Sequence, residues 1–93
     1  MTSELFRYYQ TRQRTLAKST LLPPEFDKVL HALVVEFRQQ VSTLDALGRE
    51  SLCRELGTQL QRELIHAANA RHRKVLLALL RKIERTKYQS PTG

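Results

Sequence analysis

The segment from Gly48 to Tyr88 constrains the fold of this chain more than any other stretch. Its apolar residues recur at steps of three and four, which returns them to one face of a helix with about 3.6 residues per turn. The segment contains no proline, and its only interior glycine is Gly57. It predicts one long helix, or two helices nearly end to end with an irregularity between Asn69 and Lys74. A single rod would be about 60 Å long at about 1.5 Å per residue, so it must bend or project from its own domain.

Two shorter helices are expected before this segment. The first runs from Ser3 to about Ala17, and the second runs from about Pro24 to Val41 after a turn at 18–22 that Pro23 closes. A loop is expected at 42–48. The second helix has a regular apolar face that we expect to be buried, formed by Phe26, Val29, Leu30, Leu33, Val34, Phe37 and Val41.

The composition favours an all-α fold, because the 93 residues include few glycines and no tryptophan. We expect a small helical bundle with a long C-terminal helix. One domain should cover residues 1–88, and residues 89–93 read as a linker or an artificial end.

The long segment carries more apolar surface than the first two helices can cover. Joined by a short turn, those helices should pack as an antiparallel pair and hide about half of a straight third helix. The apolar residues on its other half should then meet a second chain. This reasoning predicts a subunit interface at Val75, Leu76, Leu79, Leu80 and Ile83.

Positive charge is concentrated near the end of the sequence. The formal net charge is +7, and residues 71–87 hold seven of the sixteen Lys and Arg residues but one of the nine acids. This cluster either contacts phosphates or an acidic protein, or it forms a solvated face with cations near a helix C-terminus. The residues of the predicted contact are Arg71, Arg73, Lys74, Arg81, Lys82 and Arg85.

Residues suited to catalysis are sparse. Glu63 and His66 have the Glu-x-x-His spacing of di-iron bundles, but such a site needs a second copy and further carboxylates. Cys53, the only cysteine, lies on the apolar stripe and suits a small buried hydrophobe. The longest apolar run, Val75 to Leu80, is far shorter than the roughly 20 residues of a membrane span. We therefore expect a soluble intracellular protein without catalytic residues, metal or cofactor.

Two segments give the sequence a family resemblance. The first is Leu22-Pro23-Pro24-Glu25-Phe26 with the amphipathic helix that follows, and the second is the run from Leu60 to Leu80, in which Arg71 and Lys74 precede aliphatic residues. In this order they resemble the helical domain (A domain) of a GINS subunit, especially the archaeal type with the helical domain N-terminal and a small β-domain after it. The resemblance covers most of residues 3–85. Since no β-domain follows, we expect a one-domain piece or a naturally short form.

The resemblance implies an architectural function. GINS subunits form a ring-like tetramer that bridges the MCM replicative helicase and a Cdc45 or RecJ-like partner in DNA replication, and they hydrolyse nothing themselves. The expected partners are thus other GINS subunits, MCM and the Cdc45/RecJ-like protein, with DNA as a further candidate. The expected location is the chromosome in an archaeal cytoplasm, or the nucleus of a eukaryote. The alternative is a small basic helical module that binds nucleic acid.

Overall fold

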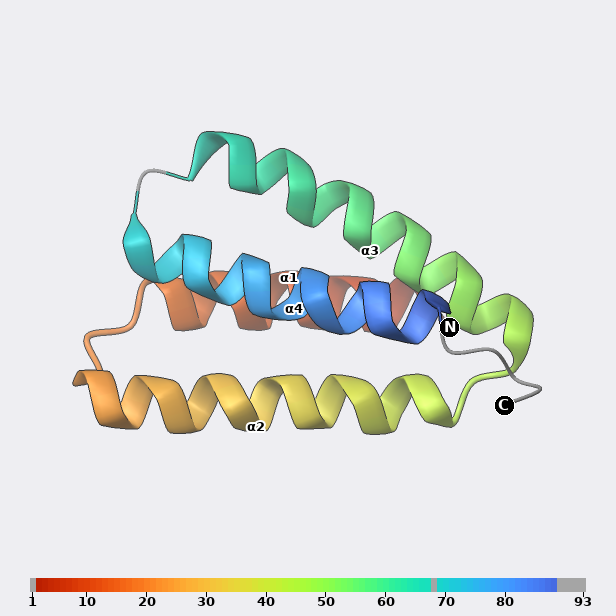
Figure 1. Ribbon diagram of the computed structural model, residues 1–93, viewed down its shortest axis with the longest axis horizontal. Coiled ribbons are helices and arrows are strands. Elements are labelled where there is room, and N and C mark those ends of the chain that lie inside the picture. The colour runs from red at the N-terminus through yellow and green to blue at the C-terminus, as the bar shows by residue number, and fades with distance from the viewer. Residues whose placement is uncertain (1, 68, 89–93) are drawn as a thin grey trace.

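The computed structural model describes residues 2–67 and 69–88, and over this part of the chain it is an all-α bundle. Its helices are α1 (Thr2–Ala17), α2 (Pro23–Ser42), α3 (Ala46–His66) and α4 (Ala70–Tyr88). Successive helices alternate in direction, as Figure 1 shows. The bundle measures 40 × 24 × 22 Å. The predicted all-α class is confirmed, whereas the predicted linker at 89–93 lies outside the described residues.

Local sequence explains where the helices begin. Pro23 occupies the first turn of α2, where a missing N–H costs nothing, and Leu22 before it is extended. Asp45 caps α3, since its side chain accepts a hydrogen bond of 2.7 Å from the Gly48 amide. The predictions for α1 and α2 are confirmed to within a residue or two, and α3 starts at Ala46, inside the predicted loop.

The prediction of one long helix, or of two helices nearly end to end, is wrong, because the chain reverses direction between His66 and Ala70. Ala67 leaves the helical conformation with ψ of 111°. The side chain of Asn69 then accepts a 2.8 Å hydrogen bond from the Arg71 amide, and its carbonyl accepts one of 3.0 Å from the Arg73 amide. Asn69 therefore starts a new helix, and α3 and α4 form an antiparallel hairpin instead of a rod (Figure 1).

The four helices are not packed as an even square. α1 and α4 form a central pair, α2 lies on one side of it and α3 on the other (Figure 1), and α2 barely contacts α3. α2 and α4 run side by side in the same direction. The helix between them in the sequence, α3, lies beyond α4.

The core explains why the predicted subunit interface is also wrong. Val75, Leu76 and Leu79 are fully buried within one chain, and Leu80 and Ile83 are 8% and 5% exposed. They pack in one cluster with apolar residues of all three other helices. The prediction assumed a straight rod, whereas the hairpin folds these side chains inward and leaves none of them for a second chain.

Exposure differs between the adjacent tyrosines of α1 and also along the apolar face of α2. Tyr9 is fully buried and packs edge-on against Phe37, whereas Tyr8 is exposed and donates a 2.7 Å hydrogen bond to Glu36. Val29 was expected on the buried face of α2 but is 37% exposed. The reason is that α2 packs against α1 and α4 on one side and faces solvent on the other.

Candidate anion-binding groove

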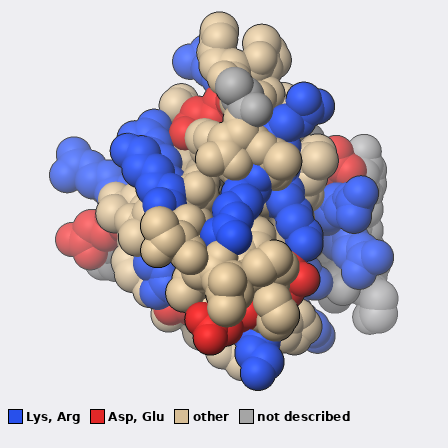
Figure 2. Space-filling model, turned by 90° about the vertical axis from the view of Figure 1, so that its left-hand side faces the viewer, with Lys and Arg blue, Asp and Glu red and all other residues tan. Residues whose placement is uncertain are grey.

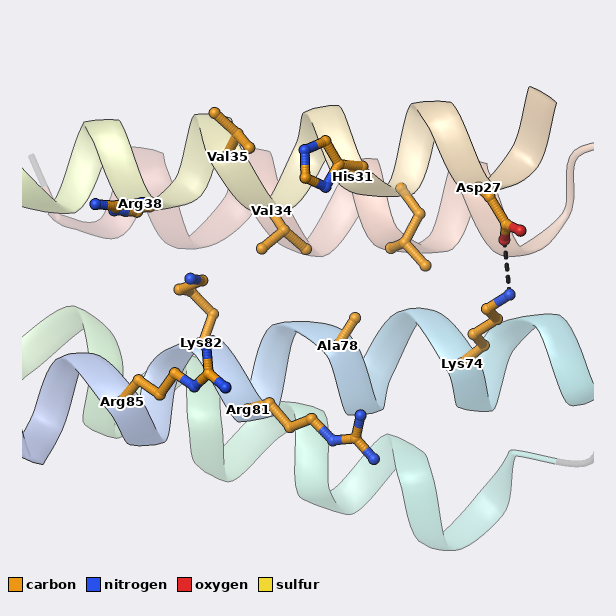
Figure 3. A pocket seen from close by; sticks show the side chains of 11 residues that line it. Asp27, His31, Val34, Val35, Arg38, Lys74, Ala78, Arg81, Lys82 and Arg85 are labelled. Atoms are coloured by element: carbon orange, nitrogen blue, oxygen red, sulfur yellow. Dashed lines mark hydrogen bonds and ion pairs between the residues drawn. The ribbon is translucent and has the colours of Figure 1, made fainter. Parts of the chain in front are cut away.

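A groove of about 510 Å³ runs between α2 and α4 along their exposed sides. Figure 3 shows the side chains that line it. From α2 they are Asp27, Leu30, His31, Val34, Val35 and Arg38, and from α4 they are Lys74, Ala78, Arg81, Lys82 and Arg85. We call this the basic groove.

Helical spacing places these residues together. On each helix the lining positions recur at steps of one, three or four residues, so they share a strip beside the buried face. Because α2 and α4 run in the same direction, Asp27 lies opposite Lys74 at one end, and Arg38 lies near Lys82 and Arg85 at the other (Figure 3). The sequence-predicted basic residues Lys74, Arg81, Lys82 and Arg85 are thus brought to one surface.

The charge of the groove is unbalanced along its length. At one end Lys74 Nζ lies 2.6 Å from Asp27 Oδ1, and this ion pair is neutral as a unit. Arg38, Arg81, Lys82 and Arg85 have no ion pair or side-chain hydrogen bond among residues 2–67 and 69–88. The groove therefore presents four uncompensated cations, three of them toward its far end, and attracts an anionic group there.

Arg71 belongs to the framework of the bundle and not to the groove. Its guanidinium donates hydrogen bonds to the carbonyls of Ser19, at 3.1 Å, and Leu21, and it lies 4.9 Å from the centre of the Phe26 ring. Two donors of Arg71 thus hold the α1–α2 loop, and the predicted role of Arg71 as a partner contact stays a prediction. Arg73 is exposed but does not line the groove.

One end of the bundle carries charges of both signs. Figure 2 shows the end of the bundle where α2 and α4 begin, and there acidic side chains lie among the Lys and Arg side chains. A mixed surface of this kind selects a charged partner weakly, because opposite charges offset each other's field. The basic groove is thus a better candidate for a binding site than the charged surface at this end of the bundle.

Sequence reasoning missed the contribution of α2 to this site. Neither His31 nor Arg38 belongs to the basic cluster at 71–87 that the sequence indicates. Arg38 follows Val34 by one helical turn, so it was placed beside the apolar face by its spacing. What the sequence could not give is that α4 lies next to this side of α2.

A second polar cluster, which is partly buried, lies between α1, α3 and α4. In this cluster Glu63 contacts Gln13, Arg14 and His72, and not His66. Gln13 is fully buried, its amide donates a 2.9 Å hydrogen bond to Glu63 Oε1, and its Oε1 lies 3.0 Å from His72 Nε2. Arg14 pairs with Glu63 at 3.1 Å. Burial by itself would raise the pKa of Glu63, but the hydrogen bonds from Arg14 and Gln13 outweigh it and lower that pKa below 4.5.

These contacts bear on the metal and thiol candidates. Glu63 faces Gln13 and His72, whereas His66 is exposed, so the Glu-x-x-His pair is not assembled. Within the described part of the chain no group of three or more His, Cys, Asp and Glu residues could hold a metal ion. Cys53 is buried, as expected from its position. No helix among residues 2–67 and 69–88 has the length and apolar character needed to cross a membrane.

Comparisons of this chain with protein-family models, with curated proteins and with solved structures found no match in any of the three.

Proposed function

We propose that this chain is a non-catalytic scaffold subunit of the GINS type, which joins sister subunits and bridges the MCM helicase and a Cdc45 or RecJ-like partner. One observation carries the proposal. The two segments on which the resemblance rests, Leu22–Phe26 and the Arg71-x-x-Lys74 run, are in contact with each other in the fold.

The contact has a clear structural purpose. Arg71 holds the loop that leads into α2 through the Ser19 and Leu21 carbonyls, and its guanidinium lies over the Phe26 ring. Lys74, one turn later, pairs with Asp27, the residue after Phe26. The segments fix the start of α2 against the start of α4. A common structural role gives a physical reason for them to occur together, which favours a shared family over chance leucine and arginine patterns.

The proposal needs a different partner surface from the one expected at first. With the predicted interface residues of α4 inside the core, partners must meet exposed side chains, and the basic groove is the surface whose charge is not balanced internally. A scaffold subunit that recognises acidic partner surfaces through this groove fits these features.

Co-purification tests the scaffold function. We expect the tagged chain to retain GINS-type subunits, MCM or a RecJ-like protein from the same genome at physiological salt, in a complex whose mass light scattering measures. Arg81→Glu with Arg85→Glu should weaken this retention, whereas Arg62→Glu with Arg73→Glu, which changes the net charge equally outside the groove, should not. Retention of none of these proteins would contradict the proposal.

Binding of nucleic acid is the second candidate, and the four uncompensated cations of the groove favour it. Each phosphate contact releases counterions. The logarithm of the association constant should therefore fall with the logarithm of the salt concentration, with a slope of about 0.9 per contact on duplex DNA. Replacing Arg81 and Arg85 with alanine should lower that slope by about one unit for each lost contact. A labelled duplex and a labelled single strand that both fail to shift at low salt would remove this candidate.

A further inference from the structure

We propose that the basic groove binds an acidic amphipathic helix of a partner protein, with aliphatic side chains on its floor and carboxylates against Arg38, Arg81, Lys82 and Arg85. This inference deepens the scaffold function, and it names the chemistry of the partner segment.

The length of the groove suits a short helix. Its lining runs from Asp27 to Arg38 on α2 and from Lys74 to Arg85 on α4, so each wall is about 16 Å long at about 1.5 Å per residue. That length matches about three turns of an added helix. Laid between α2 and α4, it would contact both helices, as the anchors of helix-in-groove complexes do.

The floor of the groove favours a peptide over a phosphate backbone. It is aliphatic along its middle, where Val34 and Ala78 point toward each other from the two helices (Figure 3), and Val35 on α2 also lines it. Val35 is 36% exposed and can lose further surface to a ligand. Apolar side chains gain from this contact, whereas phosphates gain nothing from it, and the groove lining contains no Phe, Tyr or Trp, so His31 supplies its one ring.

The charges give the binding a direction. The Lys74–Asp27 end is already paired, while Arg38, Lys82 and Arg85 lie toward the other end and Arg81 lies between. Carboxylates of the ligand should therefore gather at the Arg38 and Arg85 end, and its apolar residues should lie above Val34 and Ala78. A peptide with evenly spread acids would place some of them at the Asp27–Lys74 pair, which offers them no net positive charge.

A labelled peptide tests the proposal directly. The probe is a fluorescent helix of about 14 residues, long enough for three turns, with leucines on one face and glutamates flanking them at one end; its control has the same composition in scrambled order. We expect the anisotropy of the amphipathic peptide to rise to saturation as the protein is added. The Arg81→Glu/Arg85→Glu variant should bind this peptide at least about tenfold more weakly, whereas the Arg62→Glu/Arg73→Glu variant should bind it as the unaltered chain does. No binding, or equal binding of the scrambled peptide, overturns the proposal.

A second pair of variants separates a peptide ligand from nucleic acid. Val35 and Val29 are both on α2 and are 36% and 37% exposed, but Val35 alone lines the groove. We expect Val35→Ser to weaken the peptide by roughly threefold to fivefold through lost apolar contact, and Val29→Ser to leave it unchanged. Duplex DNA that binds more tightly than the peptide and ignores Val35→Ser would overturn the peptide assignment.

The two proposals fail separately. Peptide binding by a chain that retains no GINS-type subunit, MCM or RecJ-like protein supports the groove assignment and contradicts the scaffold function. Retention of those partners that survives Arg81→Glu/Arg85→Glu, together with no peptide binding, supports the scaffold function and overturns the groove assignment.

Discussion

Arg71 and Arg73 are two positions apart in the same helix, and the fold gives them different environments. Arg71 is half-buried and donates hydrogen bonds to two loop carbonyls, whereas Arg73 is exposed. A planar guanidinium suits the inward site, since it can serve both carbonyls while it lies over the Phe26 ring. Both residues were predicted as partner contacts, but Arg71 stabilises the bundle, whereas the side chain of Arg73 is solvated.

Removing Arg71 should destabilise the bundle. Arg71→Ala leaves the Ser19 and Leu21 carbonyls without their donor, and charged hydrogen bonds of this kind are worth about 1.5–3 kcal/mol. Arg73→Ala should change the free energy of unfolding by less than about 0.5 kcal/mol. Urea unfolding followed by circular dichroism measures both, and equal values for the two variants would contradict the framework role.

Glu63 should make stability depend on pH in the acid range. Its pKa in the folded chain is below its ordinary 4.5, so the carboxylate contributes stability above that value, and the contribution is lost as pH falls through the folded pKa. Glu63→Gln should be less stable than the unaltered chain near neutral pH, and the gap should close in acid. Melting curves from about pH 6 to about pH 3 test this. Glu84→Gln, at an exposed position, is the control.

The elements show which predictions the sequence supports and which it does not. Proline at the start of α2 and the apolar spacing within α1 and α2 fixed those helices locally, so their bounds were predicted well. The α3–α4 reversal was not, because it depends on Asn69 capping a new helix within an otherwise helical pattern of residues. The apolar face of α4 was identified correctly, but periodicity reports that a face is buried and not against which helix it is buried.

Gly57 offers a stabilising substitution in the middle of α3. A Cβ atom at this position would lie 3.6 Å from Ile83 Cγ2, which is an ordinary van der Waals distance. Alanine should therefore gain helix propensity without a clash, and Gly57→Ala should raise the free energy of unfolding by about 0.5–1 kcal/mol. Thermal melting checks the sign; a lower melting temperature would mean that α3 and α4 need the space that glycine leaves.

At the scale of the whole molecule, one chain hides the apolar surface that the sequence seemed to offer to others. Leu76 is fully buried and its neighbour Leu77 is 40% exposed, so the two leucines form a matched pair on α4. Leu76→Ala should cost about 2–5 kcal/mol, as cavities in a helical core do, and Leu77→Ala less than about 1 kcal/mol.

Light scattering alongside unfolding distinguishes a core role from an interface role for Leu76. We expect the Leu76→Ala chain to keep the mass of the unaltered protein until it unfolds. Dissociation into smaller particles at low denaturant, with the helical signal intact, would restore the subunit interface that the sequence predicted.

The basic groove could be predicted in part. The cations of α4 were visible in the sequence, and their spacing on one helix placed Lys74, Arg81 and Arg85 near one another. Arg38 and the valines of the floor come from α2, more than thirty residues earlier, and no local pattern links them to α4. The site depends on the hairpin, because the reversal between His66 and Ala70 is what returns α4 to the side of α2.

The central pairing of α1 with α4 has a consequence for how the protein is made. During synthesis α1 leaves the ribosome before α4, so Tyr9 and Leu16 wait for partners such as Leu76 until at least about sixty further residues have been added. Contacts this distant in sequence slow the final collapse. Nascent chains that end before α4 should therefore remain open to protease, and protection should arise in a single step once α4 is free.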